Sequence, residues 1–281
     1  MVSEGLTTEY WQGLVPRPQF EEYAEKYQQY FAMRRENGII ELRMHREGAP
    51  YFQTLASHNS WSQVWQEVGN DPENEVLILT GTGDKWFDSL NSQVPSDRTP
   101  ADIAKNYEDA FKLLENFVFG IDIPTIAAIN GPGVHTEVAL ACDITLCTED
   151  TQFFDPHFLV STPPGDGQGL TFQEMLGNKR AAYYMYTSQP IDAPKALELG
   201  LVSEVVARDR LMSRAWELAE MIMRRPRTVR RMTHAIVNRP FKQRLVNDFS
   251  FHLYHQVFAV LVDGEATGRI PEGEDLASFK S

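Results

Sequence analysis

The chain has 281 residues, of which 42% are hydrophobic and 23% charged, as expected for a folded globular protein with a sizeable core. Its formal net charge of −13 argues against nucleic acid or an anionic membrane surface as the main partner. No apolar run approaches the roughly 20 residues that span a bilayer, and residues 1–20 lack the pattern of a secretory signal. We therefore expect no membrane association.

The cysteine content argues against a disulfide-stapled secreted scaffold. Only Cys142 and Cys147 are present, too few to brace a secreted scaffold. Both lie in an apolar stretch, so we expect buried, unreactive thiols. The composition as a whole predicts a cytoplasmic protein.

The first part of the chain predicts an arm followed by a strand and a helix. Residues 1–34 are polar and aromatic, and we expect an arm or a short helix there. A strand is predicted over 38–45 from its apolar residues. A helix is predicted over 58–69, because apolar residues recur there at helical spacing: Trp61, Val64, Trp65 and Val68.

The middle of the chain alternates short apolar runs with helical patterns. Buried strands are predicted over 75–79, 125–129 and 144–147, and helices over about 101–119 and 138–142. From residue 163 onward the pattern is helical, with Pro190, Pro226 and Pro240 as expected boundaries between helices. Alternating strands and helices followed by a helical tail predict an α/β domain with an α-helical C-terminal region.

Four segments resemble the crotonase (enoyl-CoA hydratase/isomerase) superfamily in order and spacing. They are EVLILTGTGDKWF at 75–87, PTIAAINGPGVHTEVALACDITLCTEDTQFF at 124–154, PPGDGQGLTFQEMLG at 163–177 and IDAPKALELGLVSEVV at 191–206. The resemblance implies an α/β fold with a crotonase-like ββα superhelix core and a C-terminal α-helical trimerisation region. It implies an N-terminal arm over 1–34, the core over 35–206 and the helical region over 207–281. It also implies a homotrimer or a dimer of trimers, for which we expect residues 208–262 to form the interface; the apolar face there comprises Trp216, Leu218, Met221 and Ile222.

Departures from the CoA enzymes make the chain most similar to the β-diketone hydrolases typified by 6-oxocamphor hydrolase. His135 interrupts the glycine-rich stretch that ends at Glu137, and His157 follows a proline where CoA enzymes often carry a second glutamate. Asp166 stands where relatives have a small residue, and His58 ends a loop that replaces the Asn-Ala motif used to hold CoA. Three histidines and one aspartate thus match functional positions of that group.

The resemblance implies a cofactor-independent hydrolase that cleaves a carbon–carbon bond in a cyclic, non-enolisable β-diketone by a retro-Claisen reaction. Water must add to one carbonyl with the help of a base tuned near neutral pH. The bond then breaks and expels an enolate, which needs charge stabilisation and a proton. The second carbonyl acts as the electron sink, so we expect no metal and no organic cofactor.

Each candidate residue has a chemical and a structural interpretation. His157 is the candidate base, oriented by Asp166 on its other ring nitrogen, or else a structural histidine in a loop. His135 would donate to the enolate or protonate it, at the N-terminus of the helix that follows. Glu137 would be its partner or simply an acid in the first helical turn. His58 would donate to a substrate carbonyl, with Ser57 as the N-cap of its helix.

Other candidates rest on the resemblance alone. The backbone amides of Val134 and Leu90 would form the oxyanion hole. His255 and Gln256 stand where the diketone hydrolases have a His-Glu pair, and Gln256 cannot act as a base. His252 precedes His255 by three residues, but no third ligand is apparent and we expect no metal.

Two other functions stay open from the sequence. One is a CoA-dependent enoyl-CoA hydratase or isomerase, a common activity of this fold. The other is a catalytically silent relative that serves as a binding or scaffold protein. Four ionisable groups on motif turns favour an enzyme over the silent relative.

Overall fold

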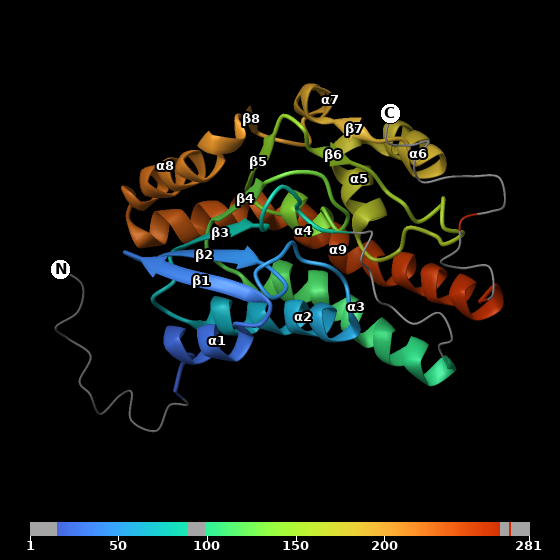
Figure 1. Cartoon of the computed structure of the whole chain (residues 1–281), viewed down its shortest axis with the longest axis horizontal. Helices are drawn as coiled ribbons and strands as arrows, with labels where there is room; N and C mark the ends of the chain where they lie inside the picture. Colours follow the sequence, from blue (N-terminus) through green and yellow to red (C-terminus); the bar gives the residue numbers. More distant parts are fainter. Residues whose placement is uncertain (1–15, 89–98, 265–269, 271–281) are drawn as a thin grey trace.

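A six-stranded sheet forms the centre of the computed structural model, which describes residues 16–88, 99–264 and 270 (Figure 1). Its strands lie in the order β1 (Phe31–Glu36), β2 (Ile39–Met44), β3 (Val76–Thr80), β4 (Thr125–Ile129), β5 (Ile144–Thr148) and β8 (Glu204–Val206). β1 and β2 pair antiparallel, and every other neighbouring pair is parallel. A second sheet pairs β6 (Gln152–Phe153) with β7 (Ile191–Asp192).

Helices cover both faces of the large sheet. They are α1 (Phe20–Tyr27), α2 (Leu55–Asn70), α3 (Pro100–Gly120), α4 (Glu137–Leu140), α5 (Gln168–Leu176), α6 (Asn178–Thr187), α7 (Ala193–Leu199), α8 (Leu211–Met223) and α9 (Arg227–Val262), with a 3-10 turn at Arg208–Arg210. Figure 1 shows α2 and α3 on one side of the sheet and α8 on the other. Within the described ranges, no helix has the length and apolarity needed to cross a bilayer.

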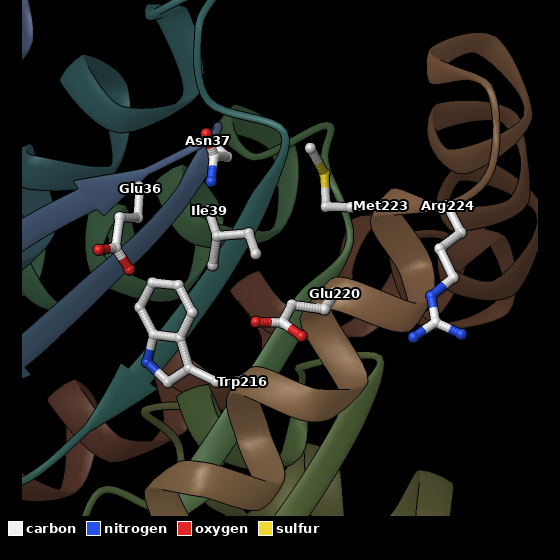
Figure 2. A pocket seen from close by; sticks show the side chains of 7 residues that line it. All are labelled: Glu36, Asn37, Ile39, Trp216, Glu220, Met223 and Arg224. Atoms are coloured by element: carbon white, nitrogen blue, oxygen red, sulfur yellow. The ribbon is translucent and has the colours of Figure 1, made fainter.

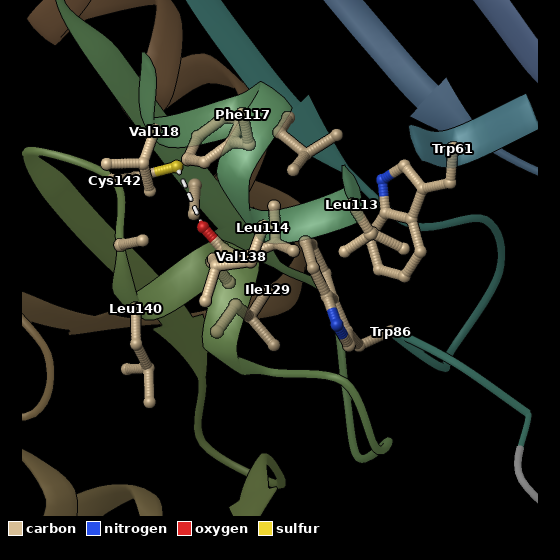
Figure 3. Close-up of a cluster of buried hydrophobic side chains, with 14 of the residues drawn as sticks. Trp61, Trp86, Leu113, Leu114, Phe117, Val118, Ile129, Val138, Leu140 and Cys142 are labelled. Atoms are coloured by element: carbon tan, nitrogen blue, oxygen red, sulfur yellow. Dashed lines mark hydrogen bonds between the residues drawn. The ribbon is translucent and has the colours of Figure 1, made fainter. Parts of the chain in front are cut away.

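The central strands are buried on both faces, which explains their continuous apolar runs. In β3, Leu77 and Leu79 belong to the large core that includes α2 and α3, whereas Val76 and Ile78 pack with α8. Figure 3 shows part of the large core, where Trp61 and Trp86 lie among aliphatic side chains of α3 and β4. Successive side chains of each central strand point to opposite faces of the sheet, so the domain has two apolar layers.

The predicted α/β class and most central elements are confirmed. Cys142 and Cys147 are free and buried, and burial raises the pKa of both thiols, that of Cys147 to about 12. The predicted helix boundary at Pro240 is wrong, because α9 continues through it. Phe241, Leu245 and Phe249 repeat every four residues on a buried face, and this packing offsets the missing backbone hydrogen bond.

Four strands were not predicted. β1 lies partly within the range assigned to the N-terminal arm, and it is an edge strand whose burial alternates along FAMRRE. The strands β6 and β7 have two residues each and β8 has three, too few to show a period of two. A strand so short is indistinguishable from a loop in the sequence pattern.

The expected interface face of α8 is corrected in part. Leu218 is buried and Trp216 packs against the sheet, donating a hydrogen bond from Nε1 to Glu41 at 2.7 Å. Met221, by contrast, is 51% exposed. Large apolar side chains are instead exposed along α9: Ile236, Val237, Val246, Phe251, Phe258, Leu261 and Val262.

We expect self-association through α9, because a row of exposed apolar side chains on one helix is costly in water. Light scattering at micromolar concentration should give three or six times the mass of the chain. Val246→Glu, at a position that is 69% exposed, should lower that mass, whereas Glu220→Gln on α8 should not. A monomer at all concentrations would contradict the expectation.

Candidate active site

The turn after β4 lies at the carboxyl end of the parallel strands, where open α/β sheets bind their ligands. The amide of Asn130 holds it against the loop after β3: its oxygen accepts from Gly81 N–H at 3.1 Å and its nitrogen donates to the carbonyls of Gly83 and Lys85. A Cβ on Gly131 would lie 1.9 Å from the Asp84 carbonyl oxygen, so only glycine fits there. This contact fixes the backbone that leads into His135.

His135 follows this turn in a left-handed backbone conformation with φ of 55°. Its ring nitrogen Nδ1 lies 2.9 Å from Oε1 of Glu137, a carboxylate that is 1% exposed. The rings of Trp61 and Phe87 pack against the imidazole at centroid distances of 6.0 and 5.2 Å. His135 and Glu137 therefore form a histidine–carboxylate pair beside two aromatic rings.

His58 lies beside His135, with 5.7 Å between the ring centroids. It occupies the first turn of α2, and Thr54 rather than the predicted Ser57 is the N-cap of that helix. His58 Nδ1 lies 3.1 Å from Oδ2 of Asp109 on α3. Asn59 and Ser62 donate to the other oxygen of that carboxylate, both at 2.9 Å.

His157 is held between two carboxylates. Its Nδ1 lies 2.7 Å from Oδ1 of Asp155, and its Nε2 lies 3.0 Å from Oδ2 of Asp166. Asp155 is fully buried, and the same oxygen also accepts the backbone N–H of His157 at 2.9 Å. The predicted pair with Asp166 is present, but a second acid occupies the other ring nitrogen.

One arrangement recurs at all three histidines: Nδ1 faces a carboxylate from Asp109, Glu137 or Asp155. An ionised carboxylate only accepts hydrogen bonds, so each Nδ1 carries its hydrogen, and Nε2 is the ring nitrogen left to meet Asp166 in His157 and a substrate in His58 and His135. No hydrogen bond reaches Nε2 of His58 or His135 from the part of the chain that the structure describes. In the same ranges, no group of three or more histidine, cysteine or acidic side chains is placed to hold a metal ion.

Interactions between neighbouring charges shift the pKa values of His157, His135 and Asp166. Burial disfavours the charged ring of His157, but the carboxylates of Asp166 and Asp155 outweigh it and raise its pKa well above 6.5. The pKa of His135 is also raised, because Glu137 and Asp166 together outweigh burial and the repulsion of His157. Burial would raise the pKa of Asp166, yet His157 and His135 lower it strongly. The raised pKa favours the cationic ring of His157, which must lose a proton before it can act as a base.

The two C-terminal candidates, His255 and Gln256, lie on α9 but have different surroundings. His255 is exposed, and its Nδ1 donates to the carbonyl of Phe251 at 2.7 Å, so it is not part of the cluster. Gln256 packs against the loop before α5: a Cβ on Gly165 would lie 2.9 Å from its Oε1. That oxygen is buried and has no hydrogen-bond partner among the residues described. Gln256 therefore packs beside Gly165, the residue that precedes Asp166.

The oxyanion candidates stay predictions. Val134 lies beside His135 and packs partly buried on the core, and Leu90 falls outside the described residues. The helix expected over 138–142 is the single turn α4, which begins at Glu137. One turn sums few peptide dipoles, so the expected dipole effect at His135 is smaller than a full helix would give.

Sequence reasoning missed Asp155, Asp109 and Gln168. Asp155 had a local signal, since an aspartate two residues before a backbone N–H commonly closes an Asx-turn. Asp109 had none, because it meets His58 only through the packing of α3 on α2. Gln168 is 3% exposed; its Oε1 accepts from Thr136, and its Nε2 has no partner in the described ranges.

A separate cleft of about 340 Å³ lies between the β1–β2 turn and α8 (Figure 2). It includes none of the candidate residues and lies on the α8 side of the sheet. Its walls combine apolar and exposed charged side chains: Glu36, Asn37, Ile39, Trp216, Glu220, Met223 and Arg224. We therefore place the candidate site at the histidine cluster.

Comparison with known proteins identifies the family. The profile of the enoyl-CoA hydratase/isomerase family matches residues 34–266. The chain belongs to this family. The short-chain enoyl-CoA hydratase of Clostridium acetobutylicum is 31% identical over 229 residues, which cover 76% of this chain and 84% of that one.

Solved structures confirm the crotonase fold within the family. A β-diketone hydrolase from the cyanobacterium Anabaena, bound to (S)-3-oxocyclohexyl acetic acid, is 30% identical with a TM-score of 0.79, covering 87% of this chain and 98% of that one. An enoyl-CoA hydratase/isomerase from Mycobacterium paratuberculosis has a TM-score of 0.74 at 22% identity, covering 85% and 96%. The resemblance to crotonases and to a β-diketone hydrolase is thus confirmed, and the chain is an enzyme of this superfamily.

Proposed function

We propose that the protein hydrolyses a carbon–carbon bond in a cyclic, non-enolisable β-diketone by a retro-Claisen reaction. The supporting observation is the cluster of His58, His135 and His157, each with a carboxylate at Nδ1. The similarity to a β-diketone hydrolase with a bound keto acid agrees with this chemistry. Keto acids are what such a cleavage produces.

In the proposed reaction, neutral His157 takes a proton from water through Nε2 while the water oxygen bonds to a substrate carbonyl carbon. The tetrahedral intermediate collapses, and the electrons of the broken C–C bond move into the second carbonyl to give an enolate. His157 then returns its proton to the enolate carbon. In the protonated form, which its raised pKa favours, His135 would donate Nε2–H to a substrate oxygen that becomes negative, and a protonated His58 could donate in the same way.

The raised pKa of His157 has a direct consequence for this reaction. A raised pKa means that the ring keeps its extra proton to a higher pH than an ordinary histidine. The base form is therefore scarce at pH 6.5 and grows as pH rises through the higher value. Activity should therefore increase with pH, with a midpoint above 6.5.

One observation favours a second candidate, an enoyl-CoA hydratase. Glu137 stands at the position of the first catalytic glutamate of those enzymes, and its Oε2 is buried with no hydrogen-bond partner among the described residues. The curated relatives carry CoA-enzyme names. Against it, Oε1 of Glu137 is engaged by His135 at 2.9 Å.

A panel of 2,2-disubstituted cyclic 1,3-diketones, incubated in H₂¹⁸O, separates the two candidates. We expect a keto acid with one ¹⁸O in its carboxylate, detected by mass spectrometry, and no hydration of crotonyl-CoA. The matched control is His157→Gln, which should cleave the diketones roughly 10²–10⁴-fold more slowly. Hydration of crotonyl-CoA without cleavage of any diketone would overturn the proposed function in favour of the second candidate.

A further inference from the structure

We propose that Asp155 is the positioning residue of His157, holding Nδ1 so that Nε2 is presented to Asp166 and to the substrate. This inference deepens the proposed function and rests on it for the role of His157 as the base. It changes the assignment of the two acids. Asp166 was expected to orient the ring, but it lies at the nitrogen that must exchange protons.

The geometry around Asp155 supports this assignment. Its Oδ1 binds both the ring Nδ1 and the backbone N–H of His157, at 2.7 and 2.9 Å. Pro156 between them has a fixed φ, which limits the conformations of the turn. The His157 carbonyl accepts from Thr162 N–H at 2.8 Å and from Val160 N–H at 3.1 Å. Backbone and ring are thus fixed together by one fully buried carboxylate.

Asp166 lacks these features. It is 14% exposed at its side chain, and the hydrogen bond to its other oxygen within the described residues is a long one, 3.5 Å from Gln168 N–H. It precedes Gly167, whose φ of 123° is open to glycine alone. Asp166 therefore bonds Nε2 without fixing the backbone of His157, and a water molecule can replace it at that nitrogen more easily than at Nδ1.

Charges that act on His157 come from several elements. Asp155 follows β6, Asp166 precedes α5, and His135, backed by Glu137, precedes α4. Two of these neighbours attract the cation and one repels it. Removing the charge of Asp155 should lower the pH at which His157 titrates.

The test is histidine NMR on the full chain labelled with ¹³Cε1 and ¹⁵N histidine, with the His157 signal assigned by its loss in His157→Gln. In Asp155→Asn, which keeps the acceptor oxygen, the titration midpoint of His157 should fall by roughly 1–3 pH units. In Asp155→Ala, the ¹⁵N shifts should also show loss of the fixed Nδ1–H tautomer. Asp109→Asn is the matched control, since Asp109 bonds His58 and should leave the His157 titration in place.

Activity provides a second readout that a merely structural acid would not change. The midpoint of the rise of kcat/KM with pH, which reports the free enzyme, should shift downward in Asp155→Asn by the same amount as the NMR midpoint. If the His157 titration and tautomer are unchanged in both Asp155 variants, the inference is overturned. If they change as expected but no diketone is cleaved by the wild-type protein, the proposed function fails while the assignment of Asp155 stands.

Discussion

His157→Gln should lower kcat for a cleaved diketone by roughly 10²–10⁴-fold, with little change in KM, because general base catalysis contributes about that factor. The wild-type profile should rise with a midpoint above pH 6.5, since Asp155 and Asp166 hold the ring in its cationic form to higher pH. That rise should disappear in His157→Gln. Steady-state kinetics between pH 6 and 10 measure both effects.

Asp166→Asn completes the argument, because the ring nitrogen that Asp166 bonds is Nε2 of His157. The variant should lower kcat and also shift the midpoint to lower pH, since it removes an attractive charge. The double variant should be only slightly slower than His157→Gln, because the bond between Asp166 and that ring is already lost. If the two losses multiply, the acids and bases of the reaction lie elsewhere, and His135 becomes the next candidate.

The fold was predictable where burial leaves a periodic or continuous apolar pattern. β3 and β4 are buried at every position, so VLILT and TIAAI stand out in the sequence. Trp61 and Trp65 marked the inner face of α2 in the same way. Edge strand β1 has no such apolar pattern, because alternate positions face solvent and several of its side chains are charged. The apolar pattern in the sequence is therefore weaker for a strand at the solvent-exposed edge of the sheet.

The site was predictable only as far as its motifs extend. His135 and His157 stand on turns that the family resemblance marks, and the structure brings them together with His58 and Asp166. The carboxylates that bond these histidines could not all be predicted in the same way. Asp109 is 51 residues from His58 in sequence, and only the packing of α2 on α3 makes them neighbours. The pKa of His157 depends on all of these charges at once, so no single motif could show that it is raised.

His135→Asn should lower kcat by roughly 10²–10³-fold, the usual cost of losing one donor to a developing oxyanion. The position requires a left-handed backbone, with φ of 55°, and asparagine tolerates this conformation better than alanine does. Backbone strain should therefore not increase, and the turn held by Asn130 should persist. The measurement pairs kcat on the cleaved diketone with the melting temperature.

His45→Asn is the matched control for this last substitution. His45 is half-buried outside the cluster, and its Nδ1 accepts the Gly48 N–H at 3.1 Å, a role that an asparagine oxygen can also fill. We expect it to retain wild-type kcat. A His135→Asn protein that melts normally and keeps full activity would show that His135 donates nothing to the reacting oxygens. In that case its contact with Glu137 serves the packing of the turn, and the stabilising donor must be sought at His58 or at the backbone amides beside it.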